Sequence, residues 1–120
     1  MTAHQPSLHP LVQALQTRIL VIDGAMGTMI QAEELVEADY RGERFAEHPT
    51  ALKGNNDLLS LTRPDIIEKI HHAYFAAGAD IIGTNSFNST AVAQADYDLG
   101  GCAAELNLAS AKIARKAADE

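Results

Sequence analysis

The chain has 120 residues, 47% of them hydrophobic, and a formal net charge of −7 at pH 7. This composition suits one α/β domain, and no apolar run approaches the ~20 residues that span a bilayer. The acidic balance and the nine scattered basic residues argue against a nucleic-acid partner. A single cysteine excludes an internal disulfide, and the first ten residues lack an export pattern, so we expect a cytoplasmic protein with no membrane partner.

Residues 1–18 are expected to be an N-terminal tail followed by a lead-in helix over Leu8–Arg18, with apolar residues at helical spacing. The run Ile19–Ile22 is apolar on both faces, which is typical of a central parallel strand. It leads directly into Asp23 and a glycine-rich turn. This places a carboxylate at the carboxyl end of the strand, where α/β folds bind their ligands.

The following segment, residues 23–57, has an irregular pattern, and only a short helix near Ile30–Glu37 is expected in it. Loops of this length are uncommon unless they are functional, so this loop is expected to arch over a site. Its last part contains three polar residues that are expected to order the loop through side-chain-to-backbone hydrogen bonds, Asn55, Asn56 and Asp57.

A helix start follows at Thr62, which we expect to be the cap, with Pro64 in the first turn and Gly78 as the stop signal. A second strand, expected to be buried on both faces like the first, is predicted over Asp80–Gly83. Another helix is predicted from Ser89 or Thr90 to Tyr97. A last helix is predicted over Cys102–Glu120, and its buried face is marked by Leu106, Ala109, Ile113 and Ala117.

Two buried strands cannot form a closed sheet, and a (β/α)8 TIM barrel needs about 250 residues. The expected fold class is therefore α/β, as the N-terminal portion of an incomplete TIM barrel. Residues 19–120 would supply its first two or so βα units, and the chain would be a fragment of the barrel.

Four segments closely resemble, in the same order, the N-terminal homocysteine-binding module of cobalamin-dependent methionine synthases. They are Asp23–Gln31, Ala38–Phe45, Leu52–Leu58 and Asn85–Thr90. Related methyltransferases that use betaine or S-methylmethionine also open with an Asp-Gly turn. They lack the Arg-Gly-Glu-Arg-Phe and Lys-Gly-Asn-Asn-Asp segments, so the cobalamin-dependent family is favoured.

The resemblance implies transfer of a methyl group from methylcobalamin, and ultimately from methyltetrahydrofolate, to zinc-activated homocysteine, giving methionine. In the family three cysteine thiolates hold the zinc, and the one cysteine here, Cys102, stands at a helix start far from where the family places those ligands. We therefore expect no catalytic or metal-binding residue and no bound zinc or cobalamin in this chain alone, with negligible methyl transfer. The implied partners are homocysteine, the rest of the barrel, and the folate and cobalamin modules of a parent chain.

The residues expected to bind the substrate come from two turns and are Asp23, Gly24, Ala25, Met26, Gly27, Thr84 and Asn85. The Asp23 carboxylate would accept hydrogen bonds from the ammonium group of homocysteine, each contributing ~1.5–3 kcal/mol. Backbone N–H groups of the glycine turn would hold its carboxylate. The residues alone leave other roles equally open. Asp23 and the glycines could simply form a turn, Met26 could pack in the core, and Thr84 and Asn85 could cap the next helix. Gly83 departs from the glutamate that the family is expected to carry there.

His71 and His72 are adjacent and so do not share a helix face; they are interpreted as solvated or partly packed histidines. Three alternatives for the whole chain stay open. The first is a fragment of a betaine- or S-methylmethionine-type homocysteine methyltransferase. The second is a small non-catalytic α/β binding module that pairs or swaps its strands. The third is a phosphate-binding α/β domain that uses the Asp23–Gly27 turn.

Overall fold

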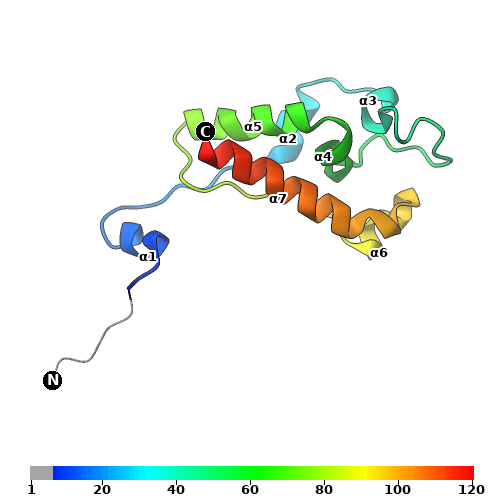
Figure 1. Cartoon of the computed structure of the whole chain (residues 1–120). Coiled ribbons are helices and arrows are strands. Elements are labelled where there is room, and N and C mark those ends of the chain that lie inside the picture. The colour runs from blue at the N-terminus through cyan, green and yellow to red at the C-terminus, as the bar shows by residue number, and fades with distance from the viewer. Residues whose placement is uncertain (1–6) are drawn as a thin grey trace.

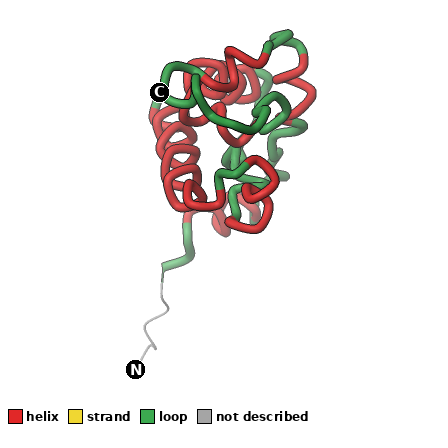
Figure 2. Tube along the Cα trace, turned by 90° about the vertical axis from the view of Figure 1, so that its right-hand side faces the viewer, coloured by secondary structure: helices red, strands yellow, loops and turns green. Residues whose placement is uncertain are grey.

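The computed structural model describes residues 7–120, and helices, loops and turns make up nearly all of this part of the chain (Figure 2). The α-helices are α1 (Pro10–Leu15), α2 (Met26–Gln31), α3 (Glu37–Arg41), α4 (Leu59–Thr62), α5 (Pro64–Ala76), α6 (Ala91–Gln94) and α7 (Ala103–Asp119). Three short 3-10 helices are η1 (Asn56–Leu58), η2 (Ala95–Tyr97) and η3 (Gly100–Cys102). The two long helices, α5 and α7, pack side by side and run in the same direction (Figure 1).

Helix α5 forms where the sequence predicts it, with Pro64 in its first turn and Gly78, at φ +107°, just beyond its end. The expected cap is wrong. Thr62 belongs to α4 and donates its hydroxyl hydrogen to the Leu58 carbonyl oxygen, while Arg63 occupies the cap position without a side-chain hydrogen bond. The reason is that a preceding helical turn, α4, already occupies the residues that a free cap would need.

Helix α7 also confirms its prediction, since it spans nearly all of the expected range. Leu106 and Ala117 are buried as expected, whereas Ala109 and Ile113 are only partly buried. The helix packs on α5 and α4, and the apolar core lies between these three helices and the loop before η1. The largest fully buried apolar side chains of this core are Leu52, Leu58, Leu59, Ile67, Ile70 and Leu106.

The two expected strands are reduced to a single parallel bridge between Ile22 and Ile81. The backbone N–H of Asp23 donates to the Ile81 carbonyl at 2.9 Å, and that of Asp80 donates to the Val21 carbonyl at 2.7 Å. The parallel direction agrees with the prediction, but the expected burial is wrong, because Ile22 is 65% exposed. A strand is buried by neighbours at both edges and layers on both faces, and within residues 7–120 this segment has one short partner.

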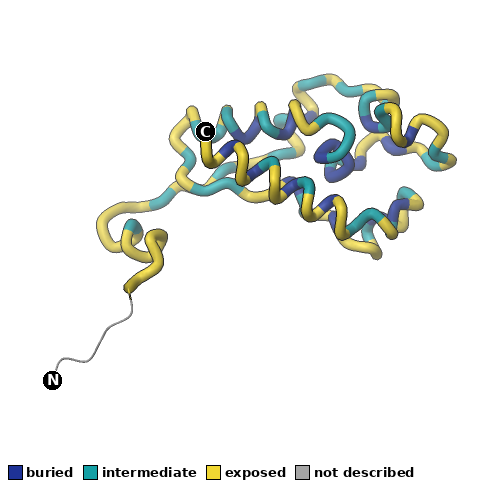
Figure 3. The backbone as a smooth tube through the Cα atoms, viewed as in Figure 1, coloured by how far each residue is buried: buried dark blue, intermediate teal, exposed yellow. Residues whose placement is uncertain are grey.

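The lead-in helix is shorter than expected and lies away from the other helices (Figure 1). Its apolar stripe is not buried, and the burial colouring of Figure 3 shows α1 as largely exposed. None of the helices in the described part of the chain is long and apolar enough to cross a membrane.

The helix expected near Ile30–Glu37 is wrong: two helices, α2 and α3, flank this range and a turn joins them. The turn contains Glu34 at φ +53°. The Asp39 carboxylate then accepts the backbone N–H of Val36 at 2.9 Å, which starts a new helix at Glu37. The next predicted helix is confirmed as α6 continued by η2, and the Thr90 hydroxyl oxygen caps it by accepting the Ala93 N–H at 3.1 Å.

Candidate functional site

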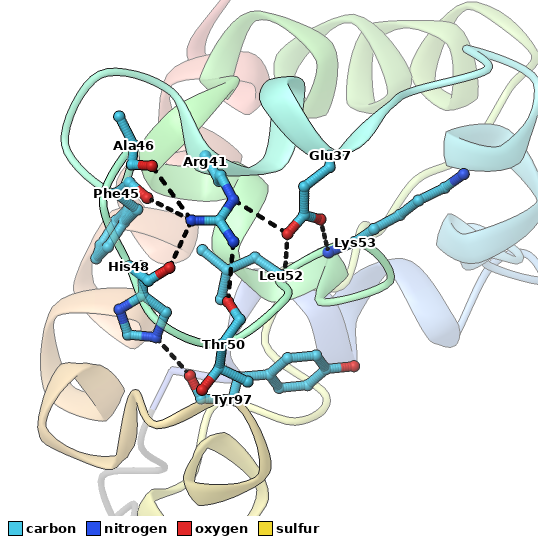
Figure 4. Close-up of polar contacts among 9 residues, drawn as sticks. All are labelled: Glu37, Arg41, Phe45, Ala46, His48, Thr50, Leu52, Lys53 and Tyr97. Atoms are coloured by element: carbon cyan, nitrogen blue, oxygen red, sulfur yellow. Dashed lines mark hydrogen bonds and ion pairs between the residues drawn. The ribbon is translucent and has the colours of Figure 1, made fainter.

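One ion pair at α3 organises the long loop that follows it (Figure 4). The Glu37 carboxylate accepts the backbone N–H groups of Leu52 and Lys53, both at 2.6 Å, and these bonds, led by that of Leu52, hold its pKa below the usual range. The Arg41 guanidinium bonds Glu37 at 3.1 Å and donates to four loop carbonyls, those of Phe45, Ala46, His48 and Thr50. We call Glu37 and Arg41 the loop clamp.

The far side of this loop is joined to η2. The ring nitrogen Nε2 of His48 lies 2.7 Å from the Tyr97 carbonyl oxygen, and the Thr50 hydroxyl hydrogen-bonds the Asp98 carboxylate (Figure 4 draws the first of these contacts). The loop is therefore a closed, hydrogen-bonded structure that connects α3 to the segment around α6.

A buried polar network connects the end of the loop to residues 85–94. The side-chain amides of Asn55 and Gln94 exchange hydrogen bonds at 2.8 and 3.1 Å, and both residues are buried. The Asp57 carboxylate accepts the Asn88 backbone N–H at 3.0 Å and the Ser89 hydroxyl at 2.6 Å. The predicted side-chain-to-backbone bonding is confirmed for Asp57 alone, because the side chains of Asn55 and Asn56 bond other side chains, those of Gln94 and Tyr40.

A cavity of about 530 Å³ lies where these segments meet. Three of the predicted substrate-binding residues line it: Met26 and Gly27 from the start of α2, and Asn85. The other lining residues come from the loop end and from α6 with its flanks, and they are Gly54, Asn55, Asn56, Asp57, Phe87, Asn88, Ala93, Asp96 and Tyr97. Gly54 has φ +99°, a backbone conformation that favours glycine, so it shapes this wall through its backbone.

Asn85 is 6% exposed and lines the cavity. Its side-chain N–H₂ group donates to the Asn56 carbonyl at 2.9 Å and to the Ser60 hydroxyl at 3.2 Å. Its side-chain oxygen has no hydrogen-bond partner among residues 7–120. Asn85 therefore connects its own segment to η1 and α4 and keeps one acceptor free.

Asp23, Gly24 and Ala25 lie on the turn before the cavity. One Asp23 carboxylate oxygen, Oδ2, accepts the Gly83 backbone N–H at 3.1 Å, and a Cβ at Gly83 would lie 3.8 Å from the other oxygen. Tyr74 supports the turn from α5, because its hydroxyl donates to the Ala25 carbonyl at 2.9 Å. The turn is therefore fixed at both ends, with Asp23 Oδ1 left free of hydrogen bonds to the described residues.

Thr84 is separated from this group. Its hydroxyl bonds that of Ser86 at 2.5 Å, and the residue lines a second groove, formed with Asp80, Ile82 and the small side chains of α7. The structure thus brings Met26, Gly27 and Asn85 together, places residues 23–25 on the adjoining turn, and leaves Thr84 outside.

The sequence reasoning missed the loop clamp and Gln94. The pattern offered one usable signal for the clamp, because Glu37 and Arg41 have the i, i+4 spacing of a helical ion pair. No short-range sequence pattern indicates the role of Gln94, because its hydrogen-bond partner, Asn55, lies 39 positions away.

One group of side chains in the described residues has the spacing of metal ligands: Glu68, His72 and Glu120, whose ligand atoms lie within 4.8 Å of one another. They lie at the contact of α5 with the end of α7. His72 Nε2 is 2.8 Å from Glu120, and Lys116 is 3.1 Å from Glu68, which lowers the pKa of the Glu68 carboxyl. These contacts make the group an exposed network of polar and ionic contacts between two helices.

The single parallel bridge between Ile22 and Ile81 opens onto a polar turn and has helices packed beside it, which is one parallel pairing of the kind that βα units make, although the described residues form almost no strand. Residues 20–120 match the family model described as Homocysteine S-methyltransferase. The chain therefore belongs to the homocysteine S-methyltransferase family, a TIM-barrel family of enzymes with homocysteine as substrate. The predicted resemblance is confirmed at this level, as are the assignments to methyl transfer and methionine biosynthesis.

The family uses zinc for homocysteine. The chain has a single cysteine, Cys102, which is partly exposed and ends η3 directly before α7. The one group with metal-ligand spacing in residues 7–120 has no thiolate and is distant in sequence from the turn at Asp23. The residues of this chain therefore do not fit a three-thiolate zinc site.

Proposed function

We propose that this chain forms part of the homocysteine pocket of a cobalamin-dependent methionine synthase. Two segments favour this member of the family over the betaine- and S-methylmethionine-type enzymes, namely Arg41–Phe45 and Lys53–Asp57. The loop clamp and the buried network give both segments a structural role, since they build the loop whose end lines the cavity.

The observation that carries the pocket assignment is the cavity between Met26, Asn56 and Asn85, with Asp23 on the adjoining turn. A cavity of about 530 Å³ falls within the ~300–1,000 Å³ of small-molecule sites and leaves ample room for an amino acid. Its lining combines an apolar side, from Met26 and Phe87, with amide groups that have hydrogen-bonding capacity.

In this proposal Asp23 binds the ammonium group of homocysteine through Oδ1, while the Gly83 N–H holds Oδ2 in place. The free side-chain oxygen of Asn85 accepts a second hydrogen bond from the ligand. Met26 and Gly27 form the surface against which the aliphatic part of the ligand packs. This chain binds and orients the substrate, and zinc and cobalamin belong to other parts of a parent protein.

The binding role is tested by titrating the 120-residue chain with homocysteine and following its amide NMR signals. Asp23→Asn removes the charge opposite the ammonium group, so the Kd for homocysteine is expected to rise about tenfold. Asp119→Asn is the matched control, because Asp119 lies at the end of α7 and forms its ion pair with Arg115. An unchanged Kd in the Asp23 variant contradicts the proposal. Tight binding of inorganic phosphate or a nucleotide in place of homocysteine favours the phosphate-binding alternative.

The methyl donor is tested with the complete parent protein. Methionine formation from homocysteine is measured with methylcobalamin, betaine and S-methylmethionine in parallel. We expect turnover with methylcobalamin alone, and turnover with either of the other donors contradicts this part of the proposal. The isolated chain is expected to give negligible product with all three.

A further inference from the structure

His71 is the least expected side chain of α5. The sequence predicted a solvated or partly packed histidine, but its side chain is completely buried. Neither ring nitrogen has a hydrogen-bond partner among residues 7–120. Buried polar groups are nearly always hydrogen-bonded, and an unpaired one costs folding free energy, so this residue requires an explanation beyond packing.

The direction in which His71 faces is given by Tyr74, which lies three positions later on the same face of α5. The Tyr74 hydroxyl donates to the Ala25 carbonyl, and a Cβ at Gly24 would lie 3.3 Å from that hydroxyl oxygen. This face of the helix therefore packs under the turn that begins with Asp23.

Two titratable groups act on the His71 ring. Burial lowers the pKa of His71, the negative charge of Asp23 acts in the opposite direction, and the neighbouring His72 lowers the pKa further. The lowered pKa favours the neutral ring, which has one N–H donor. The Asp23 carboxylate has one oxygen held by Gly83 and one free.

We propose that His71 is a positioning residue that acts through Asp23. The neutral ring directs its N–H toward the Asp23 carboxylate through one bound water, and so keeps the carboxylate aimed at the ammonium group of homocysteine. This inference rests on the proposed function, because it assigns the Asp23 carboxylate to the ammonium group.

The test compares two ligands on the 120-residue chain: homocysteine, and 4-mercaptobutanoate, which has the same chain without the ammonium group. His71→Leu is expected to weaken homocysteine binding about tenfold and to leave the Kd of 4-mercaptobutanoate unchanged. His71→Gln keeps an N–H donor and is expected to recover most of the affinity. His72→Leu is the control, since His72 contacts Glu68 and Glu120 and does not share the helix face of His71.

A purely structural role gives a different result. If His71 only supports the fold, His71→Leu weakens both ligands equally or neither, and His71→Gln gives no rescue; any of these results overturns the proposal. Thermal unfolding of each variant is measured in parallel, and His71→Leu is expected to keep the wild-type Tm because neither ring nitrogen hydrogen-bonds another residue among residues 7–120.

A measurement on the unmodified chain covers the case in which the leucine variant does not fold. The ring ¹⁵N signals of His71 are expected to shift on addition of homocysteine and to stay in place with 4-mercaptobutanoate. The absence of a selective shift overturns the role of His71. If the wild-type chain binds both ligands equally, Asp23 does not bind the ammonium group, and the proposed function fails together with this inference.

Discussion

Arg18 and Asp80, which lie 62 positions apart, form two parallel hydrogen bonds between guanidinium and carboxylate, at 2.8 and 3.0 Å. The same carboxylate accepts the backbone N–H of Val21 at 2.9 Å. Asp80 therefore fixes both the side chain before the first paired segment and the backbone within it. These bonds align residues 19–23 with residues 80–83 and so place Asp23 next to Gly83.

This relationship predicts a dependence of stability on pH. The hydrogen bonds from Arg18, followed by the one from Val21, lower the pKa of Asp80 from 3.8 to about 2. Because the carboxylate is favoured in the folded state, its contribution is complete above pH 4 and is lost as the pH falls from about 4 to about 2. Asp80→Asn is expected to lower stability at pH 7 and to flatten the pH profile in this window. Urea unfolding at several pH values checks this, and an unaltered profile would count against the assignment.

The loop clamp predicts a local loss of order. Arg41→Ala removes a charged donor from four loop carbonyls and is expected to cost about 1.5–3 kcal/mol of unfolding free energy. Arg41→Lys is expected to give little rescue, since an ammonium group lacks the planar fork of the guanidinium. Hydrogen exchange is the measurement: residues 45–53 should lose protection while α5 and α7 keep theirs. Uniform loss across the chain would show that the clamp acts on the whole fold.

The Asn55–Gln94 pair predicts non-additive mutational effects. Either single alanine variant leaves a buried amide without its partner, so each is expected to cost about 1–3 kcal/mol. The double variant removes both amides and is expected to cost less than the sum of the two. The unfolding free energies of the wild type, the two single variants and the double variant are measured to obtain the coupling energy between the two amides. Strict additivity would mean that the two amides do not depend on each other.

A carboxylate introduced at Gly83 is expected to strengthen homocysteine binding. A Cβ at this position would lie 3.8 Å from Asp23 Oδ1, which is ordinary contact, so Gly83→Ala is expected to fold normally. Gly83→Glu places a second carboxylate near Asp23 and is expected to bind homocysteine more tightly than the alanine variant, by attraction of the ammonium group. Parallel titrations with both variants measure the difference. Weaker binding by the glutamate variant would place the ammonium group elsewhere.

The helices of this chain were largely predictable because their signals are local. Pro64 and Gly78 mark both ends of α5, and the spacing of apolar residues predicts α7 with Leu106 and Ala117 on its buried side. The strands depended on partners that a local pattern cannot supply, so the apolar run at Ile19–Ile22 predicted burial that the structure does not show.

The site was predictable in part. The position of Met26, Gly27 and Asn85 around one cavity follows from the expectation that polar turns meet at the carboxyl ends of paired segments. The contacts that build the cavity wall join residues far apart in sequence, as with Asn55 and Gln94. Burial of His71 was not predicted either, because its polarity suggested solvent while its helical position places it against the core.

The open edge of the first paired segment affects how copies of the chain behave in solution. Ile19 is 86% exposed, and the backbone N–H groups of Leu20 and Ile22 bond to nothing among residues 7–120. Such an edge is a template for intermolecular strand pairing, which leads to aggregation. Each copy also carries a charge of −7, and this repulsion is screened over about 10 Å at 0.1 M salt. Dilute, low-salt buffers are therefore the conditions that keep copies apart, and added salt promotes their precipitation.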